Sequence, residues 1–299
     1  MPSLVTVAMI KLRDGRRLTY TLAGPEEGFP VVYLHGAIGT ALAIGEGVQA
    51  LGLRYICVNR PGFGGSDLQP ERTIAGFAED VEQLADALGL ERFAVVGVSA
   101  GGPYALACAR ALPARVSAVA AVSSLSPLCA PHEVPGMPAH IKLALRALAS
   151  QPDRSARLGE SVVALVRRHP WLLARAMTVG APACDRRMVA GEAARTAAAA
   201  QFLAAADGGV RGMVQDYALS SKPWGFALSE IQAEVHVFHG VRDALVPVDH
   251  ALALAAGLPR CRAWMDPEEG HFLFRRRLAD VLGAVTGAGA TSGAWTTAA

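Results

Sequence analysis

Short apolar runs rich in β-branched residues recur along the first 125 residues of the chain, and stretches with helical periodicity separate them. Nearly unbroken apolar runs are typical of strands that are buried on both faces of a parallel sheet. Their alternation with helices predicts strands joined by crossover helices. The strands predicted in this part of the chain cover residues 4–12, 17–23, 31–34, 55–58, 93–98 and 116–122.

The first two predicted strands form a hairpin, and two helices follow further along. Asp14-Gly15 lies between the two strands and suits a tight turn. Apolar residues recur at steps of three and four between Thr73 and Gly89. We therefore predict an amphipathic helix that starts at Thr73 and stops at Gly89. A second helix is predicted from about residue 102 to residue 112.

The pattern changes near residue 125, where alanine-rich helical segments with scattered prolines begin and no strand pattern is found. Strand character returns at residues 234–240 and 261–265, with a helical stretch between them. We therefore predict an α/β fold in which helices flank a mostly parallel, eight-stranded sheet and a helical cap is inserted into it. The predicted parts are a core of residues 1–124 and 226–286, a cap of residues 125–225 and a mobile tail of residues 287–299.

Composition and charge narrow the class of protein. Hydrophobic residues make up 52% of the chain and charged residues 18%, which suits a globular fold, and a net charge of +2 does not suggest a nucleic acid partner. The apolar run near the N-terminus breaks at Lys11 and has no basic segment ahead of it, so we expect neither export nor a membrane anchor. The five cysteines include no C-x-x-C pair, which indicates neither a disulfide framework nor a zinc site and fits a reducing cytoplasm. They are Cys57, Cys108, Cys129, Cys184 and Cys261.

The most informative motif is Gly-Val-Ser-Ala-Gly at residues 97–101, which matches G-x-S-x-G. It lies between a predicted strand and a predicted helix, and this context is the one in which the motif holds a nucleophile. The turn must be strained, and glycines two residues on either side of Ser99 remove Cβ atoms that would collide there. We therefore predict that Ser99 is a nucleophile exposed above the sheet, near the N-terminus of a helix.

A serine hydroxyl needs a positioned base at neutral pH, and a histidine fits this role best. His271 follows the last predicted strand, so its ring can lie at the sheet edge where Ser99 emerges. His239 is the competing candidate, although its place at a strand end favours packing against neighbours. His236 and His239 lie three residues apart on a strand and point to opposite faces, so we expect no metal pair. The other histidines are interpreted as polar surface or cap residues, except His35: His132, His140, His169 and His250.

The base in turn needs an acceptor for its second ring nitrogen. Asp243 lies in the loop directly after a predicted strand, where functional side chains collect in parallel sheets. Asp249 and Asp266 are alternatives. Asp249 falls in the first turn of the next helix, where it offsets the helix dipole, and Asp266 lies too close in sequence to His271 to reach its ring easily. Asp243 is therefore the predicted acid.

Stabilisation of a tetrahedral intermediate usually needs two backbone donors. We predict these to be the N–H groups of Ala100 and Ala37, and we expect His35 and Gly36, which begin the turn that contains Ala37, to contact the substrate. This turn lacks the Gly-Lys-Ser/Thr ending of a phosphate-binding loop, and Gly62-Phe63-Gly64-Gly65 lacks the spacing G-x-G-x-x-G, so nucleotide binding is a weak alternative.

With these pieces in place, the chain resembles the α/β-hydrolase superfamily over roughly residues 1–124 and 226–286, in the order nucleophile, acid, histidine. Asn59 stands where the family more often has aspartate, a departure that does not touch the catalytic residues. The resemblance implies that the inserted helices cover the active site and influence substrate choice. The blocks that carry it are His35-Gly36, the segment from Asn59 to Ser66, Gly97 to Gly102, Gly240 to Asp243, and Gly270-His271.

The expected activity is hydrolysis of a carboxylic ester, lactone or thioester of a small to medium-sized hydrophobic substrate through an acyl-enzyme, with no cofactor and no metal. A serine at residue 99 disfavours routes that need a carboxylate nucleophile. Hydrolysis of a carbon–carbon bond and cofactor-free perhydrolysis use the same triad and remain open. So does a ligand-binding protein of this fold without turnover. The expected partner is a small-molecule substrate, and the sequence leaves monomer and homodimer open.

Overall fold

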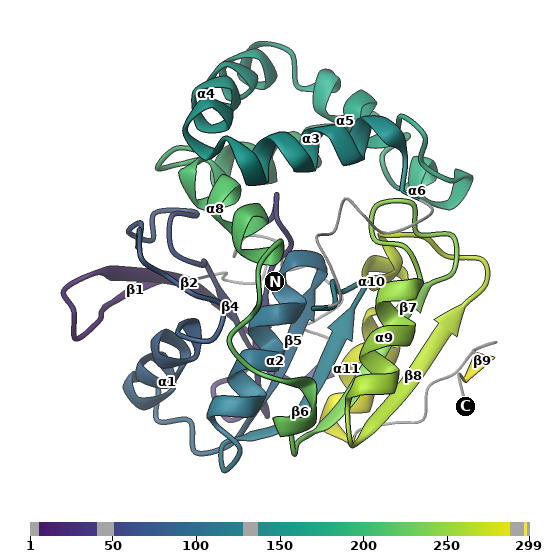
Figure 1. The fold of residues 1–299 in the computed structure, drawn as a ribbon. Helices are drawn as coiled ribbons and strands as arrows, with labels where there is room; N and C mark the ends of the chain where they lie inside the picture. The colour runs from purple at the N-terminus through teal and green to yellow at the C-terminus, as the bar shows by residue number, and fades with distance from the viewer. Residues whose placement is uncertain (1–5, 41–50, 128–136, 288–295, 298–299) are drawn as a thin grey trace.

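The structure is a computed structural model and describes residues 6–40, 51–127, 137–287 and 296–297. In this part of the chain, nine strands form one sheet in the order β1-β2-β4-β3-β5-β6-β7-β8-β9 (Figure 1). The six strands from β3 to β8 run parallel, while β1, β2 and β9 pair antiparallel with their neighbours. The predicted mostly parallel sheet of eight strands is therefore confirmed, and β9 is added at its edge. The strands are β1 (Thr6–Lys11), β2 (Arg17–Ala23), β3 (Pro30–Leu34), β4 (Arg54–Val58), β5 (Phe93–Val98), β6 (Val116–Val122), β7 (Glu234–Gly240), β8 (Cys261–Asp266) and β9 (Thr296–Thr297).

Helices cover both faces of the sheet. The side chains of the central strands point alternately to the two faces and are therefore buried on both. On one face, Val32, Ile56 and Val95 belong to an apolar cluster with residues of α1, α2 and α9. On the other face, Tyr33 and Val96 pack with residues of α10 and α11. The helices are α1 (Phe77–Ala87), α2 (Gly102–Ala111), α9 (Asp249–Gly257), α10 (Leu273–Arg276) and α11 (Leu278–Thr286).

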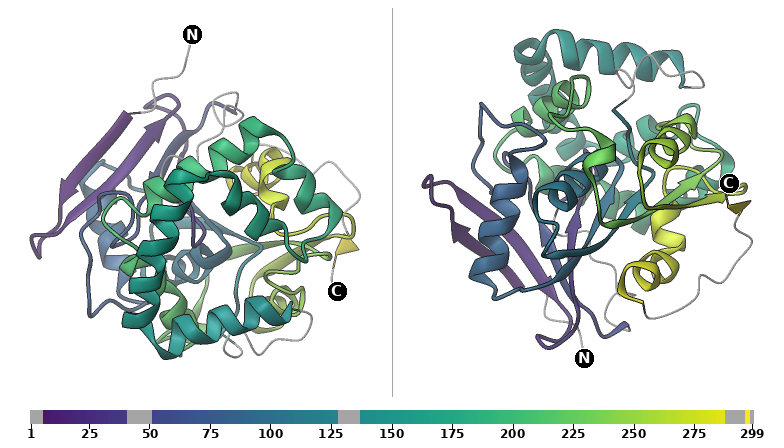
Figure 2. Two further views of the ribbon diagram at one scale, coloured as in Figure 1. Left: turned by 90° about the horizontal axis from the view of Figure 1, so that it is seen from above. Right: turned by 60° about the horizontal axis from the view of Figure 1, so that its bottom comes forward.

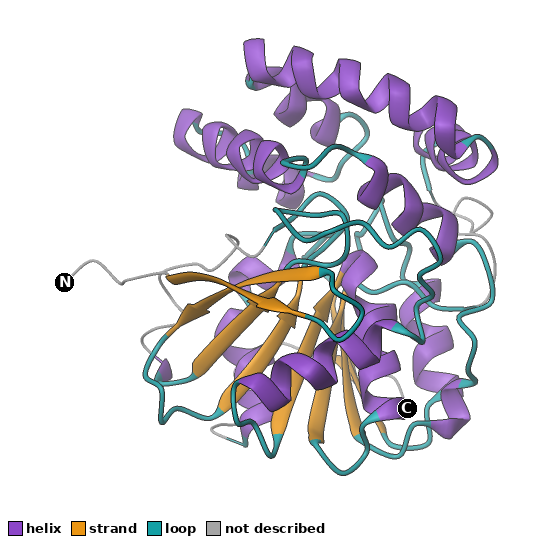
Figure 3. Ribbon diagram, turned by 90° about the vertical axis from the view of Figure 1, so that its left-hand side faces the viewer, coloured by secondary structure: helices purple, strands orange, loops and turns teal. Residues whose placement is uncertain are grey.

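A separate group of helices, α3 to α8, forms a layer above the carboxyl ends of the parallel strands (Figures 1 and 3). The left-hand view of Figure 2 looks down on this layer, which spreads over the sheet. Its own apolar cluster includes Val163, Phe202 and Met213, together with Phe63 from the loop after β4. The described helices include none that is long and apolar enough to cross a membrane. The layer consists of α3 (Ala139–Ser150), α4 (Pro152–Arg168), α5 (Trp171–Thr178), α6 (Ala183–Met188), α7 (Glu192–Ala205) and α8 (Arg211–Ser220).

The structure differs from the prediction at two element ends. The helix expected to start at Thr73 begins at Phe77, because the Thr73 hydroxyl accepts the N–H of Gly76 at 2.9 Å and holds a turn there. In the tail, expected to be mobile, Thr296–Thr297 pairs with β8. Cys129 and His132 lie outside the described residues.

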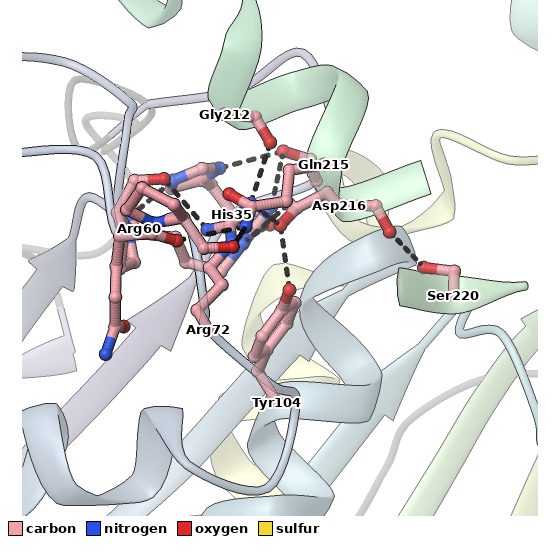
Figure 4. Close-up of polar contacts among 12 residues, drawn as sticks. His35, Arg60, Arg72, Tyr104, Gly212, Gln215, Asp216 and Ser220 are labelled. Carbon is pink, nitrogen blue, oxygen red and sulfur yellow. Dashed lines mark hydrogen bonds and ion pairs between the residues drawn. The ribbon is translucent and has the colours of Figure 1, made fainter. Parts of the chain in front are cut away.

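A buried ionic cluster joins the upper layer to the rest of the molecule (Figure 4). Asp216 of α8 is fully buried, and its Oδ2 accepts hydrogen bonds from Arg60 Nε at 2.9 Å and Arg60 Nη2 at 2.6 Å. Its Oδ1 accepts from Arg72 Nη2 at 2.5 Å and from the Tyr104 hydroxyl at 2.8 Å. The guanidinium of Arg60 also lies over the rings of Phe63 and Tyr104. The carboxylate of Asp216 thus links α8 to α2, through Tyr104, and to the segment between β4 and α1, through Arg60 and Arg72.

We predict that Asp216→Asn lowers the free energy of unfolding by about 3–5 kcal/mol, because it leaves two buried guanidinium groups without their counter-charge. Urea unfolding followed by circular dichroism measures this change. Asp207→Asn removes a carboxylate from an exposed position that follows α7 and is the matched control, for which we expect little change. An unfolding midpoint of Asp216→Asn equal to that of the unchanged protein contradicts the prediction.

Candidate active site

The carboxyl ends of neighbouring parallel strands carry the predicted site residues. In the sheet order β3-β5-β6-β7-β8, His35 follows β3, Ser99 follows β5, Asp243 lies after β7, and His271 lies after β8. Parallel strands bring their carboxyl ends to one edge of the sheet, so residues far apart in the sequence meet there. The layer of α3 to α8 lies above this edge (Figure 3).

Ser99 is in a strained conformation between β5 and α2. Its φ is 54°, a left-handed value that is uncommon for residues other than glycine. Glycine is required around it because a Cβ on Gly97 would lie 2.5 Å from the carbonyl oxygen of Gly101. A Cβ on Gly101 would lie 2.2 Å from the carbonyl oxygen of Leu34. The tight packing of this turn against the end of β3 therefore holds Ser99 in its strained position.

His271 and Asp243 form a hydrogen bond. Nδ1 of the His271 ring lies 2.8 Å from Oδ2 of Asp243, whose side chain is fully buried. The other carboxylate oxygen, Oδ1, accepts the N–H groups of Leu245 at 2.9 Å and Val246 at 2.8 Å. Because a carboxylate only accepts, Nδ1 carries the proton and Nε2 is left as the basic nitrogen of a neutral ring. Asp243 therefore fixes both the orientation and the tautomer of His271.

The charge of Asp243 also affects the pKa of His271. Burial of the ring lowers this pKa, but the charge of Asp243 and its hydrogen bond outweigh the burial, with a further contribution from Asp185. The pKa of His271 is therefore raised above its usual value of 6.5.

The structure describes both Ser99 and His271 and shows no hydrogen bond between them: Ser99 follows β5 and His271 follows β8, and the strands β6 and β7 lie between these two in the sheet. Ser123, which directly follows β6, donates its hydroxyl to the carbonyl oxygen of His271 at 3.1 Å. β6 is the immediate neighbour of β5, with Val98 paired to Val122. Contacts between nucleophile and base are often long in enzymes without substrate, so this arrangement remains compatible with proton transfer.

The turn after β3 lies against Ser99 on the other side. A Cβ on Gly36 would lie only 3.5 Å from Cβ of Ser99, so the backbone that leads to Ala37 passes next to Ser99. Ala100 is buried in the turn η3 (Ser99–Gly101), directly before α2. Arg60 supports the turn after β3 from behind by donating to the carbonyl oxygens of His35 and Gly36. Both predicted donors, the N–H groups of Ala37 and Ala100, therefore belong to segments that adjoin Ser99.

The structure does not support a substrate contact by the ring of His35. This ring is fully buried, its Nδ1 donates to the carbonyl oxygen of Gly36 at 2.8 Å, and its Nε2 accepts the N–H of Arg60 at 3.3 Å. Burial and the charge of Arg60 hold the pKa of His35 well below its usual value, so the ring is neutral. His35 shapes the turn from inside, and Gly36 is the residue of the pair that lies near Ser99.

The competing histidines have structural partners. His239 is fully buried, and its Nε2 donates to the carbonyl oxygen of Val246 at 2.8 Å. The same nitrogen lies 3.6 Å from Oδ2 of Asp243. His250 was expected to be polar surface, which is wrong: it is buried in α9, and its Nδ1 lies 3.0 Å from the N–H and 2.9 Å from the hydroxyl of Ser126. Burial lowers the pKa of His250 to about 4. Among the described residues, no group of three or more His, Cys, Asp or Glu side chains could hold a metal ion.

The alternative acids also have other roles. Asp266 accepts two hydrogen bonds from Arg277, at 3.1 Å and 2.6 Å. Asp249 begins α9, in the first turn as the sequence predicted, and its side chain is exposed. Two residues near His271 were missed by sequence analysis: Ser123 and Asp185, a buried aspartate of α6 that accepts the backbone N–H of His271. A φ of 45° at Ser123 marks it as unusual, but no sequence pattern reveals this.

Known proteins share this fold. A solved esterase, RhEst1 from Rhodococcus sp. ECU1013, superposes with a TM-score of 0.70 and 22% identity, over 95% of this chain and 99% of that one. Among curated proteins, hydrolase YcgS of Bacillus subtilis is 31% identical over 38% of this chain and 40% of its own length. The 3-oxoadipate enol-lactonase 1 of Acinetobacter baylyi is 33% identical over 33% of this chain and 38% of its own length. The chain thus matches about two-fifths of the length of these curated relatives. The sequence model of the α/β-hydrolase fold matches residues 30–275, and the chain therefore belongs to the α/β-hydrolase fold family.

Proposed function

We propose that the protein is a serine hydrolase that cleaves a carboxylic ester or lactone of a small to medium-sized hydrophobic substrate. The observation that carries this proposal is the hydrogen bond between His271 and Asp243, at the sheet edge where the strained Ser99 stands. A neutral imidazole with a fixed tautomer, at the same edge of the sheet as a serine hydroxyl, is the arrangement that acyl transfer needs. Family membership and relatives named as an esterase and an enol-lactonase agree with it.

In the acylation step, the Ser99 oxygen attacks the carbonyl carbon of the substrate while Nε2 of His271 takes the hydroxyl proton. The carbonyl oxygen becomes an oxyanion, which the N–H groups of Ala37 and Ala100 stabilise. Asp243 stabilises the imidazolium that forms. The intermediate then breaks its bond to the leaving alkoxide, which receives the proton from His271.

In the deacylation step, His271 removes a proton from water as the water oxygen attacks the acyl carbon. The second tetrahedral intermediate breaks down to the free carboxylic acid, and the proton returns to the Ser99 oxygen. No cofactor is required, because every proton and electron pair moves among substrate, water and these side chains.

The layer of helices α3 to α8 acts in this proposal as the cap that covers the site. It lies over the carboxyl edge of the sheet, so a substrate bound at that edge would lie beneath it. Perhydrolysis is the second candidate, because a relative from Streptomyces lividans named as a non-heme chloroperoxidase is 35% identical over 38% of this chain. The same acyl-enzyme would then be attacked by hydrogen peroxide in place of water. Competition between the two nucleophiles in one assay separates these activities.

We predict that a fluorophosphonate probe labels the protein stoichiometrically and that Ser99→Ala abolishes the labelling, because the probe reacts with an activated serine. Intact mass spectrometry measures the adduct. Ser150→Ala is the control, since it removes the hydroxyl of an exposed serine on α3 and leaves the labelled site in place. An adduct on Ser99→Ala shows that another residue is the nucleophile.

We predict that Asp243→Asn lowers kcat on p-nitrophenyl esters by about 10⁴-fold, because an amide favours the wrong tautomer of His271. Steady-state kinetics on a series of acyl chain lengths measures this loss. Asp249→Asn changes the exposed alternative acid and is expected to keep kcat within a few-fold of the unchanged enzyme. Similar losses in both variants contradict the assignment of Asp243.

The raised pKa of His271 predicts the pH dependence. The base must be neutral to accept a proton, so kcat/KM is expected to fall as the pH decreases through a pKa that lies above 6.5. A pH series of kcat/KM, with circular dichroism at each pH to check folding, measures this limb. A midpoint at or below 6.5 contradicts the expected effect of Asp243 on His271.

A further inference from the structure

Asp185 connects the cap to the backbone of the proposed base. It lies in α6, one of the cap helices, and is 3% exposed. Its Oδ2 accepts the N–H of His271 at 3.0 Å, and its Oδ1 accepts the N–H of Phe272 at 3.1 Å. Figure 1 shows α6 at the edge of the cap, above the end of the sheet that carries β7 and β8. A single carboxylate of the cap thus holds two consecutive peptide groups of the catalytic loop.

The carboxylate of Asp185 is compensated by these two backbone N–H groups and not by a cationic side chain. Within the described part of the chain, no lysine or arginine forms an ion pair with Asp185. Burial raises the pKa of Asp185, and the hydrogen bonds from His271 and Phe272 oppose this effect. A buried carboxylate without donors is costly, so Asp185 and the His271 loop each need the other in place.

The residue before His271 shows how close this contact is. A Cβ on Gly270 would lie between 2.4 and 2.6 Å from the carboxyl group of Asp185, which is closer than real Cβ atoms approach other atoms. The φ of Gly270 lies outside the left-handed region, so backbone conformation does not explain the glycine. Its lack of a side chain is explained by the cap carboxylate that packs against it.

His271 is held at three points that come from different parts of the fold. Asp185 of the cap binds its N–H, Ser123 at the end of β6 binds its carbonyl oxygen, and Asp243 after β7 binds its ring. The two contacts from Ser123 and Asp243 belong to the core. Of these three contacts, the one from Asp185 makes the position of the base depend on the cap.

We propose that Asp185 is a positioning residue that couples the cap to catalysis, by holding the backbone of His271 so that its ring meets Ser99. This proposal rests on the proposed function, in which His271 is the base. It gives the cap a part in the chemical step in addition to covering the site. A seated cap sets the catalytic loop, and a displaced cap releases it.

Two effects of removing the Asp185 charge follow. Loss of one backbone hydrogen bond loosens the loop, and a displacement of about 1 Å at a catalytic group can cost roughly 100-fold in rate. The charged and titratable groups that face His271 are Asp243, Asp185 and His239. Both carboxylates raise the pKa of His271, so a neutral residue 185 lowers that pKa and moves the acid limb of kcat/KM to lower pH.

The test is Asp185→Asn, which keeps the shape of the side chain but can accept only one of the two N–H groups. We expect kcat to fall roughly 10- to 100-fold, with KM changed only a few-fold and the acid limb shifted to lower pH. Asp153→Asn removes an exposed carboxylate from the cap helix α4 and is the matched control, expected to match the unchanged enzyme in all three quantities. A kcat and an acid limb of Asp185→Asn that equal those of the unchanged enzyme overturn the proposal, even where thermal stability is lower.

Gly270→Ala tests the same contact from the other side and decides the question if Asp185→Asn does not fold. The added methyl group must displace the carboxylate, so we expect a similar loss of kcat. Gly208→Ala, in the cap, adds a methyl group where no atom lies within 4 Å and is the control. Unchanged kcat in Gly270→Ala overturns the proposal.

Failure of the proposed function gives a different result. Full activity of His271→Ala shows that His271 is not the base, and this variant is measured in the same assay. If His271→Ala is inactive, His271 has its proposed role, and Asp185→Asn and Gly270→Ala then test only whether the cap positions it.

Discussion

A carboxylate removed from water must be surrounded by hydrogen-bond donors, and this requirement organises the region around Ser99. Three buried aspartates lie there, and each takes donors from segments far away in the sequence. Asp216 joins the cap to Arg60 and Arg72, and Asp243 joins the loops after β7 and β8. Asp185 joins the cap to the loop after β8. Because removal of any one of them leaves buried donors unpaired, the three acids fix how the layer of α3 to α8, the sheet and the loop after β8 lie together.

Most of the sheet could be predicted from the sequence, because the information that specifies a strand is local. The strands Arg17–Ala23, Phe93–Val98, Val116–Val122 and Glu234–Gly240 have the bounds that their apolar runs predicted. The G-x-S-x-G turn could be recognised from its local sequence; the steric need for Gly97 lies within a few residues, whereas that for Gly101 comes from the end of β3. The start of α1 was predicted too early because a single side-chain hydrogen bond, from Gly76 to Thr73, competes with the helix.

The parts that escaped prediction depend on contacts between distant segments. Asp185 and Asp216 lie in helical stretches where an acidic residue ordinarily faces water, and nothing nearby shows that each is buried against the core. The same reason explains the wrong expectation for His250, which is buried on α9 against Ser126, more than 100 residues earlier. The ring of His35 belongs to a recurring family block, yet its hydrogen bonds turn it inward. A motif specifies the backbone of this turn and leaves open which side chain reaches the substrate.

The two aspartates Asp185 and Asp216 restrict how the layer of helices α3 to α8 can move. Rigid-body lifting of the cap would withdraw Asp216 from its arginines and Asp185 from the His271 loop at the same time. Each separation leaves charged or polar groups buried without partners, at a cost of several kcal/mol. Movement within the cap costs less: α3 contains no buried residue, and Leu143 on it is 70% exposed. Displacement of α3 therefore costs less than displacement of α6 and α8, which carry the two anchoring aspartates.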